Sequence, residues 1–388
     1  MAETPAGLVY FSTHNEPTKT SRPPPLCRNV ISLYDWSIYP NRFFSMTFIL
    51  SILGIFILWL LVTKLGPRLD ASLPETKVPT NGHDISLADL SNWLDQTERE
   101  QTNVIDNAAA HVVWANENSP AVTDYCFLYL HGFSASWKET APVTQQLANH
   151  FNSNVVQGRL AGHGLTNDAM TATAEDWLQS VRDQYEIARK IGNKVIIVAT
   201  STGAPLSIWL CSHFGEEIAA CCFLSPNFRI RSPLGFLLTW PLSRYWMHLI
   251  VGRRRSWEPQ STDEAQAWSH DYSTLALIEM QKTVDWTDDQ ALENIKTPLA
   301  IMYMRNDTTV FPAAAIDAFK HWGGSPKELI EVSVDGDAEE HVFVGDITGP
   351  KRVDWCVSQF TAFLESVIET DQDAVSKQNK TMDSDSGD

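Results

Sequence analysis

Residues 195–203 read Val-Ile-Ile-Val-Ala-Thr-Ser-Thr-Gly, four branched apolar residues that run into a cluster of small ones. Such a run is typical of a buried parallel strand. Ser201 stands where the strand would end, with the small residues Ala199 and Gly203 two positions away on either side. This is the pattern of a nucleophile elbow, in which a strained turn between strand and helix raises a serine hydroxyl above the sheet. The usual pattern has glycine at both small positions, and Ala199 departs from it by one methyl group.

Short runs rich in β-branched and aromatic residues alternate with helix-like segments from about residue 105 onward. Strands are predicted at residues 111–115, 125–130, 154–157, 194–199, 218–224, 299–304 and 329–334. Helices are predicted at residues 137–151, 174–191 (with Thr173 and Asp176 as a cap), 202–214, 313–322 and 351–368. This alternation predicts an α/β fold with a doubly wound, mostly parallel sheet over residues 105–368. No strand pattern appears between residues 226 and 297, so we expect an inserted helical cap there.

A serine hydroxyl becomes a nucleophile only beside a base, and the base needs an acid that orients it. Asp307 follows one of the later predicted strands, and His341 lies in the loop after the last strand. Ligands of a doubly wound sheet lie at the carboxyl ends of its strands, so Ser201, Asp307 and His341 are predicted to meet there. Their order along the chain is the order of hydrolases that have this elbow. Asp335 and Asp337, in the same loop as His341, are alternative acids.

Stabilisation of a tetrahedral intermediate requires two backbone N–H groups aimed at its oxyanion. Thr202, directly after the serine, is one candidate donor, and Phe133, in the loop after an early strand, is the other. His131, in the same loop as Phe133, is interpreted as a residue with a structural hydrogen bond. His163, flanked by two glycines, is a candidate for contact with the substrate.

The predicted cap is rich in aromatic and apolar residues between positions 234 and 250, and three arginines follow at 253–255. Trp240 and Trp246 are the candidate substrate-binding residues of this segment. One interpretation is a roof over an acyl pocket, with the arginines in solvent. The other is a cap that also touches an anionic bilayer, because aromatic residues beside a basic cluster suit such an interface.

The net charge of −18 and the pI of about 5.0 argue against a nucleic-acid-binding surface, and no basic stripe offsets them. The six cysteines have neither a metal-ligand nor a disulfide spacing, so no metal site is predicted. Cys126, Cys211, Cys221 and Cys222 lie in apolar runs and are expected to be small core residues.

Both ends of the chain differ in composition from the predicted domain. Residues 1–42 are interpreted as a flexible arm, and residues 43–63 as a single-pass transmembrane helix, because no charge occurs between Arg42 and Lys64. The flanking charges are too evenly divided to decide on which side of the membrane the domain lies. Residues 64–104 are interpreted as a stalk followed by an amphipathic helix, and residues 369–388 as an acidic, disordered tail.

The run 129–164, the elbow Ala-Thr-Ser-Thr-Gly, Asp307 and His341 resemble the α/β-hydrolase superfamily. The resemblance is to its carboxylesterase and monoacylglycerol-lipase-like branch, which is grouped with serine aminopeptidase-type hydrolases, and it covers roughly residues 105–368. It implies the α/β-hydrolase fold and ester hydrolysis through an acyl-enzyme, with Ser201 as nucleophile, His341 as base and Asp307 as acid. It implies no metal or organic cofactor.

The first hypothesis is therefore a membrane-anchored serine hydrolase that cleaves short or medium acyl esters or monoacylglycerol-like lipids, with an amphiphilic ester and the bilayer as partners. One alternative is a peptidase of the proline-aminopeptidase type, which needs an acidic pocket for the substrate amine. Another is a catalytically silent scaffold on the same fold.

Overall fold

The structure, a computed structural model, describes residues 41–63, 65–79, 85–105, 107–166, 169–333 and 341–385, without the side chains of residues 41–45, 61, 63 and 371–385. Residues 1–58 and residues 59–388 form two separate units. The predicted arm lies almost wholly outside the described residues. Helix α1 (Asn41–Thr63) is apolar, and its side chains from residue 46 to residue 60 are exposed. Among the described residues, no helix reaches the length and hydropathy needed to cross a membrane.

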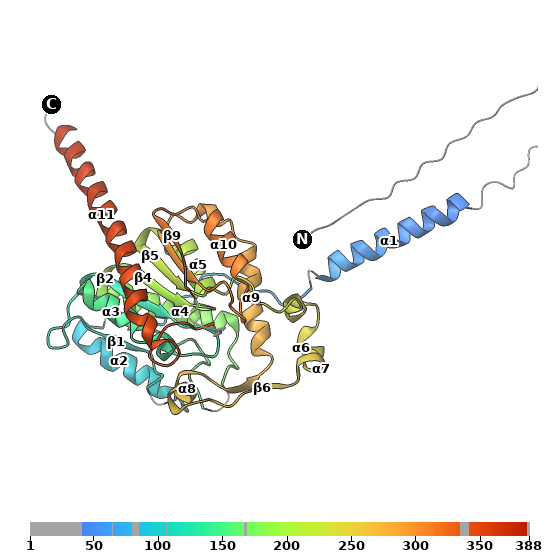
Figure 1. The fold of residues 1–388 in the computed structure, drawn as a ribbon, viewed down its shortest axis with the longest axis horizontal. Coiled ribbons are helices and arrows are strands. Elements are labelled where there is room, and N and C mark those ends of the chain that lie inside the picture. Colours follow the sequence, from blue (N-terminus) through green and yellow to red (C-terminus); the bar gives the residue numbers. More distant parts are fainter. Residues whose placement is uncertain are drawn as a thin grey trace, which may run out of the picture. The chain divides into compact units, whose positions relative to one another are not determined.

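The larger unit is built on a seven-stranded sheet with the strand order β1-β3-β2-β4-β5-β8-β9 (Figure 1). Its strands are β1 (His111–Val113), β2 (Thr123–Leu130), β3 (Asn154–Gln157), β4 (Gly192–Thr200), β5 (Ile218–Leu224), β8 (Leu299–Tyr303) and β9 (Lys327–Glu331). Only β1 is antiparallel to its neighbour, and the other pairs are parallel. All seven strands lie where the sequence predicts them, within three residues at either end, and the mostly parallel sheet is confirmed.

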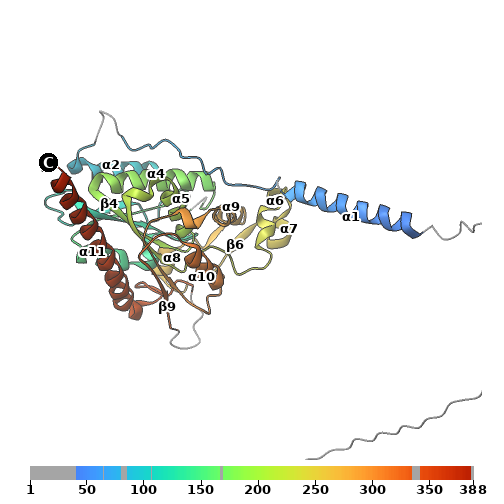
Figure 2. The same ribbon diagram turned by 90° about the horizontal axis from the view of Figure 1, so that it is seen from above.

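Strand β4 is buried on both faces, which is why its sequence is continuously apolar rather than alternating. Val195, Ile197 and Ala199 belong to one core, which includes residues of α4 (Ala174–Ile191), α5 (Gly203–Phe214) and α10 (Pro312–His321). Ile196 and Val198 belong to the other core, with residues of α3 (Val143–His150) and α11 (Val353–Asp385). Helices therefore cover both faces of the sheet, as Figures 1 and 2 show.

Two predicted helices differ from the observed ones, and one predicted cap is confirmed. Thr173 and Asp176 form a capping box at the start of α4. The segment 137–151 is divided into a 3-10 helix (Trp137–Thr140) and α3, because Pro142 has no N–H to continue the hydrogen-bonding pattern. Helix α11 continues to Asp385, although the sequence predicted its end at residue 368 and a disordered tail beyond. No proline or glycine occurs after residue 368 until Gly387, so nothing in the sequence breaks the helix.

The segment before the domain is fastened to it. The described residues 65–79 have no regular structure, but the Thr76 hydroxyl and the Lys77 N–H both donate to Asp183 of α4, at 2.9 and 2.6 Å. The indole of Trp209 donates to the carbonyl of Ala71 at 2.9 Å, and Val78 is buried. These residues are therefore part of the domain rather than the stalk that the sequence predicted. The amphipathic helix α2 (Leu87–Glu100) follows and buries one apolar face, as predicted.

The predicted cap lies between β5 and β8. It contains a 3-10 helix (Gly235–Thr239), α6 (Ser243–Trp246), α7 (His248–Val251), β6 (Arg254–Ser256), α8 (Thr262–Ala267), β7 (Asp271–Ser273), α9 (Ala276–Asp288) and a second 3-10 helix (Leu292–Asn294). The expectation of a cap without strands was wrong, because β6 and β7 pair as a two-stranded antiparallel sheet. Both strands have three residues and are largely polar, so neither shows the apolar alternation by which strands are predicted.

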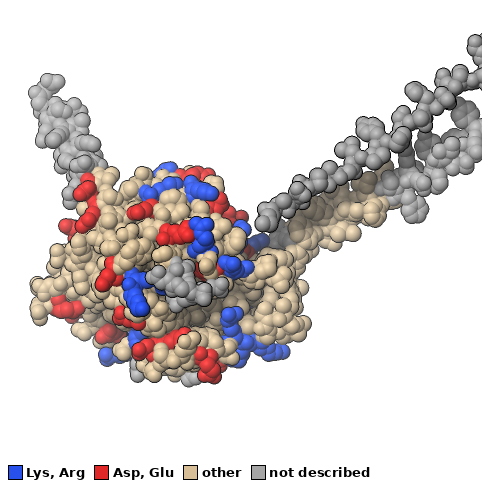
Figure 3. Space-filling view, viewed as in Figure 1, with Lys and Arg blue, Asp and Glu red and all other residues tan. Residues whose placement is uncertain are grey.

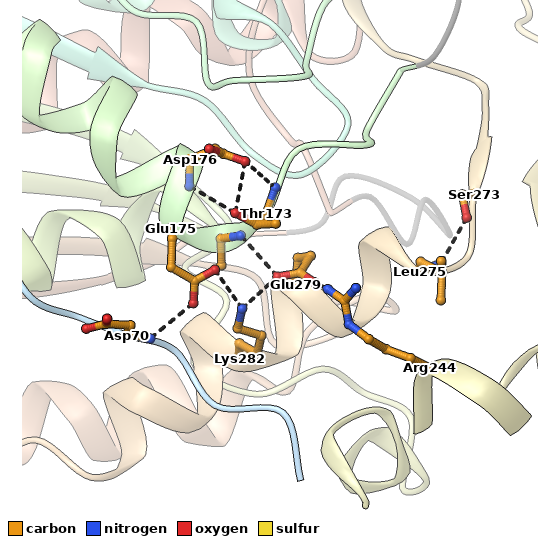
Figure 4. Close-up of polar contacts among 10 residues, drawn as sticks. Asp70, Thr173, Glu175, Asp176, Arg244, Ser273, Leu275, Glu279 and Lys282 are labelled. Carbon is orange, nitrogen blue, oxygen red and sulfur yellow. Dashed lines mark hydrogen bonds and ion pairs between the residues drawn. The ribbon is translucent and has the colours of Figure 1, made fainter. Parts of the chain in front are cut away.

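An ionic cluster around the buried Lys282 and Glu279 fastens the cap to the core (Figure 4). Lys282 of α9 lies 2.8 Å from a carboxylate oxygen of Glu279 and 2.8 Å from one of Glu175, which belongs to α4. Glu279 also pairs with Arg244 of α6. The backbone N–H of Asp70 donates to Glu175 at 3.1 Å. Removal of one partner from such a cluster leaves a buried charge uncompensated, so the cluster holds cap, core helix and the 65–79 segment in one arrangement.

Candidate active site

Ser201 stands at the turn between β4 and α5. Its φ is +50°, a left-handed conformation that is uncommon for a residue with a side chain. The Ser201 N–H donates to the carbonyl of Leu224 at the end of β5 (3.0 Å), and its carbonyl accepts the N–H of Asn227 (3.0 Å). These backbone bonds hold the strained turn that the elbow pattern predicts.

Position 203 requires a glycine because α5 begins directly against the end of β2. A Cβ atom at Gly203 would lie 2.1 Å from the carbonyl oxygen of Leu130, which is far inside van der Waals contact. Ala199, two residues before the serine, is fully buried. The single methyl group by which this elbow departs from the usual pattern is therefore accommodated in the core.

The structure brings Ser201, His341 and Asp307 together. His341 Nε2 lies 2.8 Å from the Ser201 hydroxyl, and His341 Nδ1 lies 2.7 Å from Asp307 Oδ2. The other carboxylate oxygen of Asp307 accepts the N–H groups of Thr309 (2.8 Å) and Val310 (2.9 Å). Asp307 is buried, and Ser201 and His341 line a cavity. The alternative acids Asp335 and Asp337 lie outside the described residues.

This geometry can support nucleophilic catalysis by serine. An Nδ1–H donated to Asp307 leaves Nε2 as the acceptor that can take the proton of the Ser201 hydroxyl. Because both oxygens of Asp307 accept hydrogen bonds, the carboxylate has one orientation, and it fixes the imidazole in turn.

The two candidate oxyanion donors are Thr202, directly after the serine, and Phe133, in the loop after β2. Thr202 is fully buried at the start of α5, and Phe133 lines the same cavity as Ser201. Within the described part of the chain, the backbone N–H of neither residue donates to a protein acceptor. The Phe133 ring packs against Tyr272 of the cap, with ring centroids 5.5 Å apart. Two N–H groups without acceptors beside a nucleophile are what an oxyanion site requires.

A buried carboxyl group that sequence reasoning missed holds the Phe133 loop. Glu139 Oε1 accepts the N–H of Gly132 at 2.5 Å and the hydroxyl of Tyr129 at 2.9 Å. Tyr129 is within hydrogen-bonding distance of Thr200, the residue before Ser201, at 2.9 Å. Burial raises the pKa of Glu139 to about 7. Glu139 therefore links the loop of Phe133, a candidate oxyanion donor, to the end of β4.

The Glu139→Gln variant should change how stability depends on pH. The raised pKa means that the folded protein keeps a proton on Glu139 which the unfolded chain has lost, so the contribution of Glu139 to stability falls as pH rises from about 4.5 to about 7. The lowered pKa values of the buried His131 and His163 contribute the opposite slope in both proteins, so the contribution of Glu139 is the stability of wild type minus that of the variant. The fall is of the order of 3 kcal/mol, and glutamine, which does not titrate, should remove it. Urea unfolding of both proteins across this range measures the difference. Parallel stability curves for wild type and variant would contradict the assignment.

The cavity beside Ser201 has a volume of about 540 Å³. Its walls are mostly apolar and come from the cap, with Leu237, Leu238, Met247, Leu277 and Met280 among them. A larger cavity of about 800 Å³ lies near Ile218 and Pro298, at the opposite ends of the strands, and contains none of the three residues. An apolar cleft with a few polar groups at one end is the usual form of a small-molecule site.

Three predicted substrate-binding residues do not line this cavity. His163 is fully buried, lies against Trp177 with ring centroids 5.2 Å apart, and has a pKa well below its usual value because of burial. Trp240 and Trp246 are half-buried in the cap, and the Trp246 indole donates to the carbonyl of Pro241. The aromatic-rich composition of the cap predicted that this segment lies over the site, but it did not show which of its side chains line the cavity.

Other residues line the cavity without having been predicted. They are Asn227, Arg231, Arg255, Trp257, Trp268 and Tyr272. Trp257 and Trp268 are aromatic residues of the cap, so composition was the one available signal for them. The positions of the two arginines depend on β6 and on the loop after β5, and neither was visible in the sequence.

His131 has the structural role predicted for it. Its Nδ1 lies 2.9 Å from the carbonyl of Gly132, and its Nε2 accepts the N–H of Leu160 at 2.9 Å. Burial lowers its pKa to about 4, so the ring is neutral at pH 7. It ties the Phe133 loop to the loop after β3.

A mostly parallel sheet with a serine elbow after a central strand and a cap after the next one defines an α/β-hydrolase. Residues 123–333, more than half of the chain, match the family model described as serine aminopeptidase, S33. The chain therefore belongs to this family of hydrolases.

Solved structures share the fold. One belongs to the work on LipS and LipT, two metagenome-derived lipolytic enzymes; it is 18% identical, with a TM-score of 0.52, and covers 68% of this chain and 99% of that chain. Another is the monoacylglycerol lipase of Paleococcus ferrophilus, at 15% identity and a TM-score of 0.51, covering 66% of this chain and 98% of that one. At such identities the likeness shows the fold alone. Among curated proteins, none matches this sequence.

Proposed function

We propose that this chain is a serine hydrolase that cleaves carboxylic esters of an amphiphilic, acyl-chain-bearing substrate through an acyl-enzyme. The observation that carries the proposal is the row Ser201–His341–Asp307, with hydrogen-bond distances of 2.8 and 2.7 Å, at the end of a mostly apolar cavity. The lipolytic activity named for both related structures supports the same class of substrate.

The proposed reaction has two halves. The Ser201 oxygen attacks the ester carbonyl carbon while His341 takes the hydroxyl proton, and Asp307 stabilises the resulting imidazolium. The N–H groups of Phe133 and Thr202 bind the oxyanion of the tetrahedral intermediate. On collapse the bond to the alcohol oxygen breaks, and His341 protonates the departing alcohol. Water, deprotonated by His341, then attacks the acyl-enzyme and releases the carboxylic acid and free Ser201.

The cavity walls favour an ester over a peptide substrate. An aminopeptidase needs a carboxylate that pairs with the substrate's amino group, and no Asp or Glu lines the cavity among the described residues. Met247 and the cap leucines suit an acyl chain instead. The joint presence of a strained serine, its base and its acid argues against a silent scaffold.

A series of esters and one amide substrate test the proposal. p-Nitrophenyl esters of two to twelve carbons should be hydrolysed, with a rate maximum at medium chain length, whereas proline p-nitroanilide should be cleaved at least 100-fold more slowly. A preference for the anilide would make the chain a peptidase.

We further propose that residues 43–63 anchor the enzyme in a membrane as a single-pass helix. The support is the absence of charge between Arg42 and Lys64 and the exposed apolar side chains of residues 46–60. The cap carries further exposed apolar residues at and after the start of α6, including Leu242, Tyr245 of α6 and Leu249 of α7. Such residues suit the bilayer surface to which the anchor would hold the domain.

Two truncations should separate the anchor from the domain. A chain that starts at residue 65 should be active and soluble, because all the proposed catalytic residues and the fastened segment 65–79 are retained. A chain that starts at residue 85 should lose about 2–4 kcal/mol of stability, because the bonds to Asp183 and the burial of Val78 are lost. Carbonate extraction measures whether each chain is released from the membrane. Urea unfolding measures the loss of stability. Recovery of the 65-start chain in the membrane fraction would contradict the anchor.

A further inference from the structure

Two arginines and no acidic residue line the cavity beside Ser201, as far as the described residues go. They are Arg231 and Arg255, among more than twenty lining residues. The chain as a whole has 47 acidic and 29 basic side chains, so the lining is opposite in charge to the molecule. Figure 3 shows both signs of charge over the surface, with Lys and Arg grouped where Figure 1 shows β6.

Arg231 is placed beside the proposed catalytic acid. Its backbone N–H donates to the carbonyl of Thr309 at 2.9 Å, next to an isolated bridge between Ile230 and Val310. Its guanidinium Nη1 donates to the backbone carbonyl of Asp307 at 2.6 Å. A guanidinium has five N–H donors, so donors remain for a ligand in the cavity.

Arg255 lines the same cavity from the cap. It stands in β6 directly opposite Tyr272 of β7, and opposite residues of a two-stranded sheet project on the same face. Tyr272 also lines the cavity and packs on the ring of Phe133. Of the three consecutive arginines, Arg255 alone lines the cavity. Its neighbour Arg254 pairs with Asp271 at 2.8 Å, whereas no described carboxylate forms an ion pair with Arg255.

The cavity therefore has an apolar part, formed by cap residues such as Leu238 and Met247, and two cationic groups. An acyl chain occupies the apolar part at no electrostatic cost, and the alcohol portion of the ester is left near the guanidinium groups. Guanidinium forms paired, charge-assisted hydrogen bonds with phosphate and carboxylate. A neutral alcohol offers no such partner.

We propose that the preferred substrate is an acyl ester whose alcohol portion carries an anionic group, phosphate or carboxylate, which Arg255 and Arg231 bind. This inference rests on the proposed ester hydrolysis and narrows its substrate class. Arg255 is then a specificity-determining residue, whereas Arg231 combines ligand binding with support of Asp307.

The test compares matched esters that differ by the anion alone. The first pair is the neutral 1-octanoylglycerol and the anionic 1-octanoylglycerol 3-phosphate. The second pair is the neutral 3-(octanoyloxy)propan-1-ol and the anionic 3-(octanoyloxy)propanoate. All four esters are kept below micelle-forming concentrations. The ratio of kcat/KM for the anionic member to that for the neutral member should exceed about ten in at least one pair, and the pair identifies the anion. The ratio should also fall as NaCl is raised from 0.05 to 0.5 M, an order-of-magnitude range for screening.

Arg255→Gln should lower this ratio about tenfold, and Arg255→Lys should lower it less. Arg253→Gln is the matched control, because Arg253 does not line the cavity, and it should keep both the ratio and the basal activity. A wild-type ratio near one in both pairs, or equal ratios in the Arg255→Gln and Arg253→Gln variants, would overturn the proposal. Ester hydrolysis without anion preference would refute this inference alone, whereas absence of hydrolysis of all four esters would refute the proposed function.

Discussion

Replacement of Ser201 by alanine should lower ester turnover by about 10⁴ to 10⁶-fold and leave only the acceleration that binding and the oxyanion donors provide. Among the described residues, the side chain of Ser201 has one hydrogen bond, to His341, so the substitution removes no other hydrogen bond there. Alanine has the same backbone freedom as serine at a φ of +50°, so the elbow should remain intact. Steady-state kinetics with a medium-chain p-nitrophenyl ester measure the loss of turnover. A circular dichroism spectrum checks that the fold is retained.

Ser212→Ala provides the matched control for this variant. Ser212 lies further along the same helix, α5, is exposed, and has its hydroxyl bonded to the Trp209 carbonyl. Its replacement should leave turnover within about twofold of wild type. Near-full activity of Ser201→Ala would mean that another residue is the nucleophile.

Asp307→Asn should lower kcat by about 10³ to 10⁴-fold while the fold is retained. The carboxylate uses one oxygen for the N–H groups of Thr309 and Val310 and the other for His341. Asparagine has a single oxygen, and if that oxygen keeps the two backbone bonds, its NH₂ faces His341 Nδ1. The ring proton then moves to Nε2, which can no longer accept the proton of Ser201.

The kinetics of Asp307→Asn are compared with those of Asp317→Asn. Asp317 is an exposed residue of α10 near His321, and it has no role in the proposed reaction. An unchanged rate for Asp307→Asn would transfer the role of the acid to Asp335 or Asp337.

The parts of the fold that the sequence predicted well are those whose signal is local. Strand β4 and its turn were readable because four branched residues and three small ones lie next to one another. Ser201, Asp307 and His341 could be predicted to meet because each follows a parallel strand, and parallel strands end at one edge of the sheet. The capping box of α4 is likewise a pattern of four adjacent residues.

The parts that the sequence did not predict depend on contacts between distant segments. Strands β6 and β7 pair across fourteen intervening residues, 257–270, and they alone bring Arg255 and Tyr272 to the cavity. Glu139 lies in a segment predicted as a helix, and its bond to the Gly132 N–H depends on the fold rather than on a local pattern. The segment 65–79 resembled a linker, but its bonds are to α4 and α5, more than a hundred residues later.

The most direct test of the central claim is covalent labelling of the full-length protein with a fluorophosphonate probe, followed by digestion and mass spectrometry of the labelled peptide. Such a probe reacts with serine only where a base has activated it. We expect one labelled residue, Ser201, at pH 7 to 8, and loss of the label in His341→Ala. Labelling of a different residue, or none in a protein that is folded by circular dichroism, would contradict the assignment of Ser201 as the nucleophile.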